Sequence, residues 1–396
     1  MSEWQIFCLK DLGKIVGGAT PPTNNPKNYG NKIAWITPKD LSTLQGRYIK
    51  KGSRSISRLG FKSCSCALLP KHAILFSSRA PIGYVAIAEK RLCTNQGFKS
   101  IIPNKKIYFE FLYYLLKYHK DNISNIGGGT TFKEVSGATL GLFEVKIPPT
   151  YYEQQKIART LSILDQKIEN NHKINELLHK ILELLYEQYF VRFDFLDENN
   201  KPYQTSGGKM KFSKELNRLI PSGWSVRFLN HKIVSTYQPK TISKTLLNDS
   251  YSYSVYGGGG IIGRFTEYNH EQSEFIISCR GQCGISYLTL PKSWITGNAM
   301  VIRPTKSYTS KTYLYHTIKK YKLTNYITGS VQPQITRQNL STMPILIPKR
   351  KTLNKWNNIS SLLWNLIHNN MQSTQTLTAL RDFLLPLLLK QQVKPK

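Results

Sequence analysis

The stretch that decides the fold is residues 151–192, YYEQQKIARTLSILDQKIENNHKINELLHKILELLYEQYFVR, which contains neither proline nor glycine. Its apolar residues recur in alternating steps of four and three, with Asn171 and Asn175 in the two vacant places. A 3.5-residue period over about five heptads predicts a long helix with a coiled-coil seam. A second apolar stripe (Ile174, Leu177, Ile181 and Leu184) is expected to widen this face. The seam positions are Ile157, Leu161, Leu164, Ile168, Leu178, Leu182, Leu185 and Tyr189.

The last segment of the chain repeats this pattern, with Asn370 aligned to Asn171. A polar residue inside a seam fixes register at a cost in stability, so two helices with matched polar positions are expected to pack antiparallel. About 40 residues would form a rod of about 60 Å, ending or kinking near Pro386. Two unrelated amphipathic helices, each docked on its own domain, are the alternative. The seam positions are Trp356, Ile359, Leu363, Leu366, Asn370, Ser373, Leu377, Leu380, Leu384 and Leu387.

The second half of the chain echoes the first at an offset of about 200 residues. Each half opens near a tryptophan (Trp4 and Trp224) and closes with a long helical segment. Such a repeat predicts two copies of one structural module. The matched segments are Ser78-Arg79 with Cys279-Arg280, residues 94–97 with 296–299, residues 126–128 with 327–329, and residues 145–148 with 345–348.

Within each half, short β-branched and aromatic runs alternate with Gly, Pro and Asn, which predicts strands joined by turns. Residues 73–76, 84–88 and 144–147 are expected strands of the first half, and residues 275–278, 285–288 and 299–302 of the second; residues 109–120 and 311–322 are expected helices. The fold class is therefore α+β, with two duplicated mixed α/β domains separated by a pair of long antiparallel coiled-coil helices. The expected parts are residues 1–150 (first domain), 151–192 (first helix), 193–220 (linker), 221–350 (second domain) and 351–396 (second helix and tail).

The formal charge of +32 is divided unevenly along the chain. Residues 1–150 hold 22 basic and 8 acidic side chains, residues 151–212 hold 9 of each, and residues 213–350 hold 18 and 5. Two basic blocks on either side of a neutral one favour a polyanionic partner, because each phosphate neutralised releases a counterion. A membrane surface is disfavoured because no basic amphipathic helix accompanies the charge.

The chain shows no apolar run long enough to span a membrane and no secretory signal, so a soluble, cytoplasmic protein is expected. Its six cysteines form no CxxC pair and lack the spacing of a zinc site. We expect reduced, mostly buried thiols.

Polar and basic side chains at the predicted turns offer contacts to DNA. Arg79 and Arg280 would clamp a phosphate or read guanine with two hydrogen bonds, a structural ion pair being the alternative. Asparagines and glutamines match adenine edges, although ordinary turn chemistry explains them equally well. Lysines there would contact phosphate. The candidate residues are Lys39, Arg79, Asn95, Gln96, Lys99, Thr130, Thr131, Lys133, Tyr256, Arg264, Arg280, Asn298, Gln332, Gln334 and Arg337.

The chain resembles the DNA-specificity subunits of type I restriction–modification systems over nearly its whole length. The resemblance implies two target-recognition domains that each read half of a bipartite double-stranded DNA site. It also implies modification subunits, expected to be two, that methylate adenine, and restriction subunits that translocate and cleave DNA. S-adenosylmethionine, ATP and Mg²⁺ would then be bound by those partners, with no cofactor on this chain. The motifs that carry the likeness are WITPKDL (35–41), SSRAPIG (77–83), TNQGFK (94–99), GGTTFK (128–133), IPP (147–149) followed by Glu153-Gln154, YFVRFDF (189–195), SGGKM (206–210) and YGGGGIIG (256–263).

The second helix departs from this pattern, because Leu353-Asn354 stands where the first helix has Glu153-Gln154. Equal docking of partners on both sides is therefore not implied.

Motifs for catalysis on this chain are missing. Residues 147–150 (IPPT) lack the polar first and aromatic fourth residues of an adenine-methyltransferase loop, and no GxxxxGK[ST] sequence occurs. Asp121 with Glu144 is the nearest acidic pair for a metal nuclease, and a solvated strand edge explains it better. The sequence predicts a non-catalytic DNA-binding subunit. A stand-alone DNA methyltransferase or nuclease, and a coiled-coil scaffold that does not bind DNA, remain the alternatives.

Overall fold

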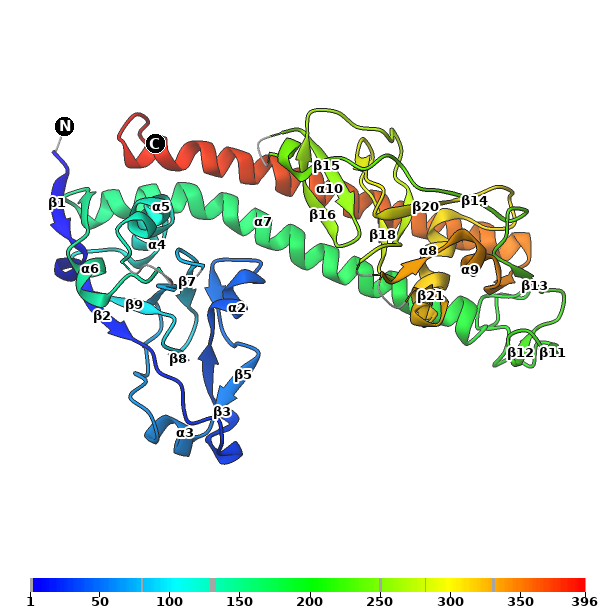
Figure 1. The fold of residues 1–396 in the computed structure, drawn as a ribbon, viewed down its shortest axis with the longest axis horizontal. Helices are drawn as coiled ribbons and strands as arrows, with labels where there is room; N and C mark the ends of the chain where they lie inside the picture. The colour runs from blue at the N-terminus through cyan, green and yellow to red at the C-terminus, as the bar shows by residue number, and fades with distance from the viewer. Residues whose placement is uncertain are drawn as a thin grey trace. The chain divides into compact units, whose positions relative to one another are not determined.

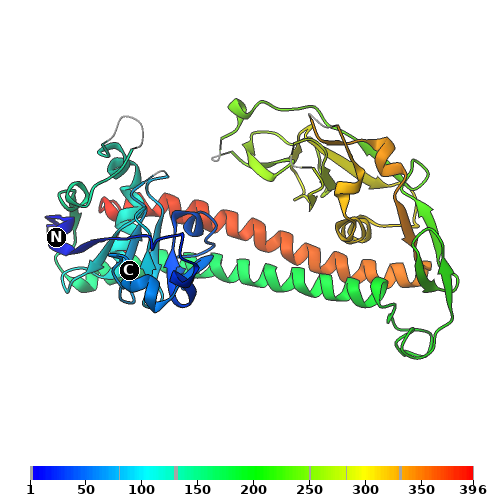
Figure 2. The same ribbon diagram turned by 60° about the horizontal axis from the view of Figure 1, so that its bottom comes forward.

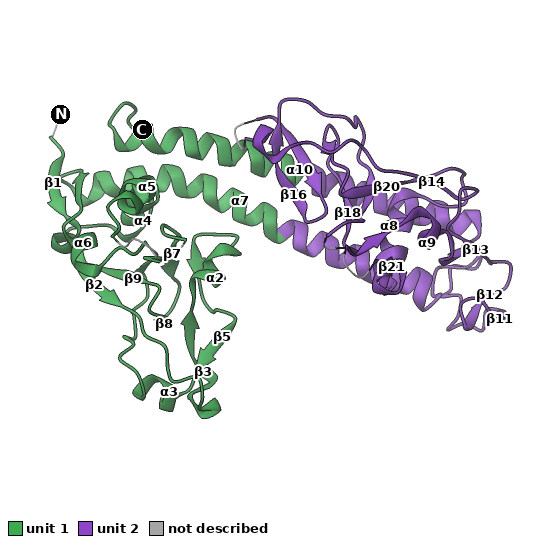
Figure 3. Cartoon of the chain, in the orientation of Figure 1, with its two compact units in different colours: residues 1–173, 370–396 green, residues 174–369 purple. Residues whose placement is uncertain are grey.

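The computed structural model describes residues 3–79, 81–128, 133–248, 251–281, 283–329 and 332–395. The chain divides into unit 1 (Met1–Lys173 with Asn370–Lys396) and unit 2 (Ile174–Asn369), coloured separately in Figure 3. Each unit contains a mixed α/β domain and a part of each of two long helices, α7 (Tyr151–Tyr186) and α10 (Arg350–Leu389). Within each unit the two helices run antiparallel (Figures 1 and 2). The predicted α+β fold class is confirmed.

The domain of unit 1 is built on a five-stranded sheet, in which the last strand joins in parallel. A smaller three-stranded sheet and one antiparallel strand pair complete it. The five-stranded sheet has the order β2 (Gly13–Gly17), β9 (Lys99–Pro103), β6 (Ile74–Phe76), β7 (Val85–Ala88), β4 (Tyr48–Ile49). The smaller sheet has the order β5 (Arg54–Ile56), β3 (Tyr29–Ile36), β8 (Cys93–Thr94), and β1 (Gln5–Cys8) pairs with β10 (Glu144–Ile147).

Helix α4 (Phe109–Tyr118) packs on strands β6 and β7, and its residues 110–116 are buried. The core beneath it also takes in Ile157 and Leu161 of α7 and Leu385 and Leu388 of α10, so the long helices complete the domain rather than merely adjoin it. The shorter helical elements are α1 (Leu9–Leu12), η1 (Pro26–Asn28), α2 (Pro38–Ser42), α3 (Arg58–Lys62), α5 (Lys120–Asn125) and α6 (Gly137–Gly141).

Unit 2 repeats this plan with a four-stranded sheet and helix α8 (Lys311–Lys320). The four-stranded sheet has the order β14 (Val234–Tyr237), β20 (Ala299–Pro304), β17 (Phe275–Ser278), β18 (Ser286–Leu288). The smaller sheet has the order β16 (Gly260–Phe265), β15 (Tyr253–Gly257), β19 (Trp294–Ile295). The strand pairs are β13 (Ser225–Phe228) with β23 (Pro344–Ile347), β11 (Met210–Ser213) with β12 (Arg218–Pro221), and β21 (Ile327–Thr328) with β22 (Gln334–Ile335). The remaining helical elements are η2 (Glu187–Val191), η3 (Lys244–Leu246), η4 (Leu323–Tyr326) and α9 (Arg337–Ser341).

One connection explains why the two sheets differ in strand number. In unit 1, β3 runs to β5 through residues 37–53, which include α2 and β4. In unit 2 the corresponding strands β15 and β16 pair as a tight hairpin, closed at Gly257 and Gly260. Gly260 has φ +99°, which a side chain would strain. The glycine run at residues 257–260 is therefore a hairpin turn that leaves no chain for a fifth strand.

The seam predicted for α7 agrees with the structure: Ile157, Leu161, Ile168 and Leu182 are buried and Leu164 and Leu178 are half-buried. At its polar positions, the Asn171 amide donates to the Asn370 carbonyl at 3.4 Å and to the Thr374 hydroxyl at 3.2 Å in unit 1. In unit 2 the Asn175 amide donates to the Ile367 carbonyl at 3.3 Å. The second stripe was wrong as a buried face, because Ile174, Leu177, Ile181 and Leu184 are exposed.

The seam of α10 lies one residue later than predicted at most positions. Leu366 is 44% exposed whereas Ile367 is buried, and Leu384 is half-buried whereas Leu385 is buried. Leu363, Asn370 and Leu377 are half-buried. Adjacent apolar pairs allowed either register, and contact with the domain cores decides between them.

Pro386 does not end α10, which continues to Leu389. A proline here removes the backbone hydrogen bond that residue 386 would donate and crowds the carbonyl four residues earlier, so continuing the helix through it is costly. Leu385, Leu388 and Leu389 are buried in the core of unit 1, and this burial holds the last turn in place.

The predicted linker, residues 193–220, packs as part of unit 2. Phe195 stacks on Trp224 with ring centroids 5.1 Å apart, Phe193 meets the same indole edge-on at 5.6 Å, and the β11–β12 hairpin follows.

Candidate nucleic-acid interface

In unit 1 a fixed set of backbone hydrogen bonds holds the segment that leaves β6. Ser78 N donates to the Gly97 carbonyl at 2.8 Å, and Val135 N donates to the Ser78 carbonyl at 2.9 Å. The Ser77 hydroxyl accepts from Tyr84 N at 2.8 Å. Three segments far apart in sequence, near residues 78, 97 and 134, are thus joined around Arg79.

Unit 2 contains the same frame. Cys279 N donates to the Asn298 carbonyl at 3.0 Å, Ile335 N donates to the Cys279 carbonyl at 3.0 Å, and the Ser278 hydroxyl accepts from Ile285 N at 2.7 Å. Arg280 stands where Arg79 stands, each bridged in its backbone to the third segment. The predicted duplication therefore extends to individual hydrogen bonds.

The predicted alignment of the second segment was shifted by one residue. Ser78 pairs with the Gly97 carbonyl and its counterpart Cys279 with the Asn298 carbonyl, so Asn298 corresponds to Gly97 rather than to Gln96. The error arose because both turns contain a threonine, a glycine and an asparagine in different order.

Two of the predicted basic residues of unit 1 pair with the same carboxylate, that of Glu134, which was not predicted as part of the site. Arg79 Nε lies 2.9 Å from Glu134 Oε2, and Lys99 Nζ lies 3.5 Å from Glu134 Oε1. The Arg79 side chain is 48% exposed, so it remains accessible to a larger anion. Lys133 is exposed next to Glu134. An acidic residue within a basic loop was the only available signal for Glu134.

The turn at residues 94–97 lies against the start of α2. A Cβ atom on Gly97 would lie 2.9 Å from Pro38 Cγ, and Lys39 beside it is exposed. The Asn95 side chain accepts from Gly97 N at 3.0 Å, so it forms the turn as the alternative reading proposed. Gln96 is exposed and its side-chain oxygen accepts from the Thr20 hydroxyl. Thr130 and Thr131 lie outside the described residues.

Asp40 holds the α2 corner in place. Burial alone would raise the pKa of Asp40, but hydrogen bonds from Ser53 N at 2.7 Å and from the Thr37 hydroxyl and backbone lower it below its ordinary value. The carboxylate caps α2 at its N-terminus and so fixes the exposed Lys39 at the first turn.

In unit 2 the predicted residues Arg280, Asn298, Gln332, Gln334 and Arg337 are exposed. Arg280 and Gln334 are bridged, and Arg337 begins α9 just beyond them. These residues of three segments surround the same frame.

Two predicted residues of unit 2 have other roles. Tyr256 is 3% exposed and its hydroxyl accepts from Leu290 N at 3.1 Å, so it belongs to the core, and we withdraw it as a DNA contact. The Arg264 guanidinium is half-buried and donates to the Ser252 carbonyl at 2.5 Å, which ties β16 to the start of β15.

Three further properties bear on the chemistry. Among the described residues, no group of three or more His, Cys, Asp or Glu side chains is arranged to hold a metal ion. In the same part of the chain, no helix is long and apolar enough to cross a membrane. All six cysteines are free thiols, with Cys66, Cys93 and Cys279 buried.

Comparison with known proteins matches this two-part arrangement. The family model described as "Type I restriction modification DNA specificity domain" matches residues 1–180 and again residues 221–380. The chain belongs to this family. The type I restriction enzyme MjaIX specificity subunit of Methanocaldococcus jannaschii is 32% identical, over 98% of this chain and 92% of that protein. The HindI specificity subunit of Haemophilus influenzae is 31% identical over 46% of this chain and 40% of its own length.

The fold of this specificity-family chain also matches a solved structure. The crystal structure of a type I restriction–modification S subunit from M. genitalium superposes with a TM-score of 0.60 at 18% identity, covering 97% of this chain and 96% of that one.

Within the motif at the start of α7, Gln154 is buried, accepts from Tyr108 N at 2.8 Å and donates to the Lys106 carbonyl at 3.0 Å. Aligning Asn171 with Asn370 shifts the predicted pairing by one residue, so that buried Leu353, and not Asn354, takes the place of Gln154 in α10. Gln154 therefore ties the start of α7 to the segment that precedes α4 in unit 1.

Proposed function

We propose that this chain is the DNA-specificity subunit of a type I restriction–modification complex. Each domain reads one half of a bipartite double-stranded site, and the chain directs adenine methylation, and restriction, by partner subunits. Modification subunits, two in number, would supply S-adenosylmethionine, and restriction subunits would supply ATP and Mg²⁺. The chain itself carries no catalytic step.

The observation that carries this proposal is the repeated hydrogen-bond frame, which presents Arg79 in unit 1 and Arg280 in unit 2 at the same place. An exposed arginine on a rigid backbone can read guanine with two hydrogen bonds, and neighbouring lysines can hold phosphate. Two such frames in one chain suit a target read in two halves.

The pairing of Arg79 with Glu134 supports a selective rather than a general attraction. A carboxylate 2.9 Å from the guanidinium lowers the attraction to any phosphate, so a productive contact must replace that pair with good geometry. The same carboxylate also contacts Lys99.

The test begins by locating the site from methylated adenine in DNA that was modified by the assembled complex. Binding is then measured on duplexes in which one half-site or the other is scrambled. Arg79→Ala is expected to weaken binding about 10- to 100-fold on the intact site and to have no further effect once its own half-site is scrambled. Arg280→Ala should show the same pattern for the other half.

Glu134→Gln provides the matched control, since it removes the competing carboxylate and keeps the side-chain size. It is expected to strengthen binding to scrambled duplexes and to reduce discrimination between sites. Equal losses at both half-sites for either arginine variant would contradict the division of labour. Methyl transfer by the purified chain alone would contradict the non-catalytic role.

A further inference from the structure

Unit 2 contains a cavity of about 370 Å³ between the edge of its main sheet and the long helix α10. Leu288 of the edge strand β18, Lys311 of α8, and Trp364 and His368 of α10 line it. Trp364 is 6% exposed, yet its indole Nε1 has no hydrogen-bond partner among the described residues, and the same holds for His368 Nε2. Buried polar groups left in this state are costly unless a ligand satisfies them.

In unit 1 the corresponding place is filled by the chain itself. The polar positions Asn171 and Asn370 align the two helices, which sets Trp364 at the place of Asp165 and His368 at the place of Glu169. In unit 1 these acids face Arg47, whose Nε lies 3.1 Å from Glu169 Oε1. Arg47 directly precedes β4, which is the strand that the tight hairpin removes from unit 2.

The edge strand β18 still has the backbone N–H group that would donate a hydrogen bond to such a fifth strand. In unit 1, Ile87 N of β7 donates to the Arg47 carbonyl at 2.8 Å. The equivalent residue in β18 is Leu288, because Thr289 N donates inward to Glu274 as Ala88 N does to Ala73. Antiparallel pairing alternates the direction of N–H groups, so Leu288 N faces away from β17, towards the edge. Across the described residues β18 pairs with β17 alone.

The charge of the lining is reversed between the two units. Unit 1 surrounds Arg47 with Glu110, Asp165 and Glu169, each within 4.0 Å. In unit 2 their places hold Thr312, Trp364 and His368, and a cation, Lys311, faces the cavity. Burial lowers the pKa of Lys311 and of His368, so the lining offers an ammonium donor beside a neutral imidazole.

The nearby acids are already engaged. The carboxylate of Glu274 lies close enough to Lys311 to interact with its charge, but it is paired with Arg303 at 2.6 Å. The carboxylate of Glu271, at the rim of the cavity, is paired with Lys292 at 3.7 Å. The Lys311 ammonium donates to the Ser273 carbonyl at 2.5 Å, which points it along the cavity wall. An acceptor, and best an anion, is the group that this lining complements.

We infer that the cavity and the edge of β18 receive an extended segment of a partner protein, which adds as a parallel strand and inserts a carboxylate side chain beside Lys311 and Trp364. Its backbone carbonyl accepts from Leu288 N, as the Arg47 carbonyl does in unit 1, and its carboxylate accepts from Lys311. The inserted strand completes a fifth position of the sheet.

Two synthetic peptides test this on the full chain. The first carries residues 45–51 of this protein with Arg47 replaced by glutamate (QGEYIKK), and the second keeps arginine (QGRYIKK). The readout is the indole N–H signal of Trp364 in tryptophan-labelled protein, which has six tryptophans, assigned through Trp364→Phe. The glutamate peptide is expected to shift this signal saturably and to slow hydrogen exchange of Leu288. The arginine peptide should bind at least tenfold more weakly.

Lys311→Met should weaken the glutamate peptide at least tenfold, whereas Lys322→Met, at an exposed lysine beyond the same helix, should leave it unchanged. Should Lys311→Met fail to fold, the comparison of the two peptides still decides. An unmoved Trp364 signal, equal binding of both peptides, or the same shift with inorganic phosphate alone would overturn the inference.

Discussion

The two units attach their domains to the same helix pair by opposite means. Unit 1 uses a buried ionic network: Arg47 Nη1 lies 3.0 Å from Glu110, and Asp165 of α7 accepts from Tyr114 at 2.5 Å and from Arg381 of α10 at 2.8 Å. The Arg47 side chain is only 4% exposed. Burial alone would lower the pKa of Arg47, but the surrounding anionic groups raise it above its ordinary value.

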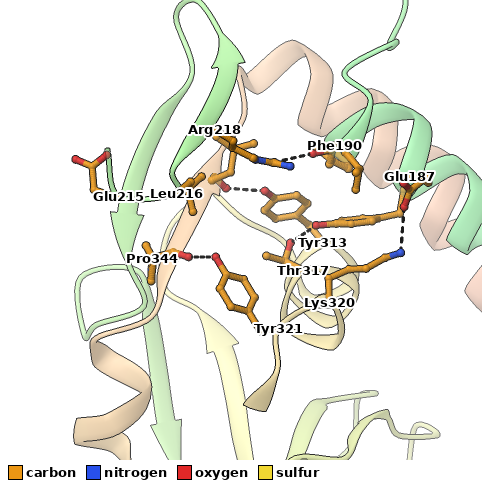
Figure 4. Close-up of a pocket in the computed structure, with 13 residues that line it drawn as sticks. Glu187, Phe190, Glu215, Leu216, Arg218, Tyr313, Thr317, Lys320, Tyr321 and Pro344 are labelled. Carbon is orange, nitrogen blue, oxygen red and sulfur yellow. Dashed lines mark hydrogen bonds and ion pairs between the residues drawn. The ribbon is translucent and has the colours of Figure 1, made fainter. Parts of the chain in front are cut away.

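Unit 2 uses stacked and edge-on rings instead. Phe190 lies 4.7 Å from Tyr313 and 5.5 Å from Trp356, and Tyr186 stacks with His316 at 5.5 Å. Tyr313 donates to the Leu346 carbonyl at 2.6 Å, and the Tyr186 hydroxyl donates to the Thr317 hydroxyl at 3.0 Å. Figure 4 shows Tyr313, Thr317 and Phe190 in the lining of the pocket that these rings border. These aromatic groups border a cavity of about 480 Å³, with Lys320 and Glu187 paired at its margin.

The difference teaches that the same duplicated fold can attach a domain to the long helices through ion pairs or through aromatic rings. We call these contacts the ionic joint of unit 1 and the aromatic joint of unit 2. The two joints should respond differently to mutation and to pH. Ionic groups in a buried network depend on one another, so removing one leaves charges without partners. Aromatic rings contribute through their contact area and geometry, so a packing of rings tolerates a single substitution better than an ionic network does. It is destabilised, however, when a buried group such as an imidazole takes up a proton and becomes charged.

The largest expected effect is at Arg47. Arg47→Ala leaves Glu110, Asp165 and Glu169 together in a buried site, so unit 1 should lose about 3–5 kcal/mol of its free energy of unfolding. Urea unfolding followed by amide exchange of residues in each unit measures this separately for unit 1 and unit 2. Lys292→Ala, which removes an arm of an exposed pair, is the matched control and should cost less than about 1 kcal/mol. A comparably small loss for Arg47→Ala would show that the network does not hold the domain.

The contrast between the units also shows what sequence reasoning can reach. Arg79 and Arg280 could be predicted as candidates because each comes two or three residues after a strand that the apolar pattern marks. Glu134 was missed, since its contact with Arg79 joins segments that only the fold brings together. The register of α10 was missed because adjacent apolar pairs such as Leu366 and Ile367 fit two seams equally well. The apolar period of the sequence predicts which helices and strands form. Which side chains they bury depends on the surfaces against which they pack.

The second effect is a pH dependence centred on the aromatic joint. Burial lowers the pKa of His316 to about 3 and that of His368 to about 4. Both are neutral in the folded chain, whereas in the unfolded chain they take up protons below about pH 6.5. Stability is therefore present above that pH and is lost as the pH falls, by about 2 kcal/mol for each histidine at pH 5, levelling off below the folded pKa.

His316→Phe should remove about 2 kcal/mol of the loss in unit 2 between pH 7 and pH 5, measured by urea unfolding at both values. His231→Ala, at an exposed histidine, is the control and should leave the loss in place. If the profile of unit 2 stays unchanged in His316→Phe, protonation of the aromatic joint is not the cause of its acid sensitivity.

The smallest effect concerns the exposed ion pair that flanks the aromatic joint. Lys319 and Glu183 are paired, but their side chains are 48% and 49% exposed, so a double-mutant cycle of Lys319→Ala with Glu183→Ala should give a coupling below about 1 kcal/mol that shrinks with salt. Arg381 and Asp165, which are 13% and 5% exposed, should show a larger coupling that resists salt. Because both pairs link a helix to its surroundings with similar geometry, burial is the variable that separates them. Equal coupling free energies in the two cycles would mean that burial does not strengthen the ion pairs of unit 1. The difference between the two units would then come only from the aromatic contacts of unit 2.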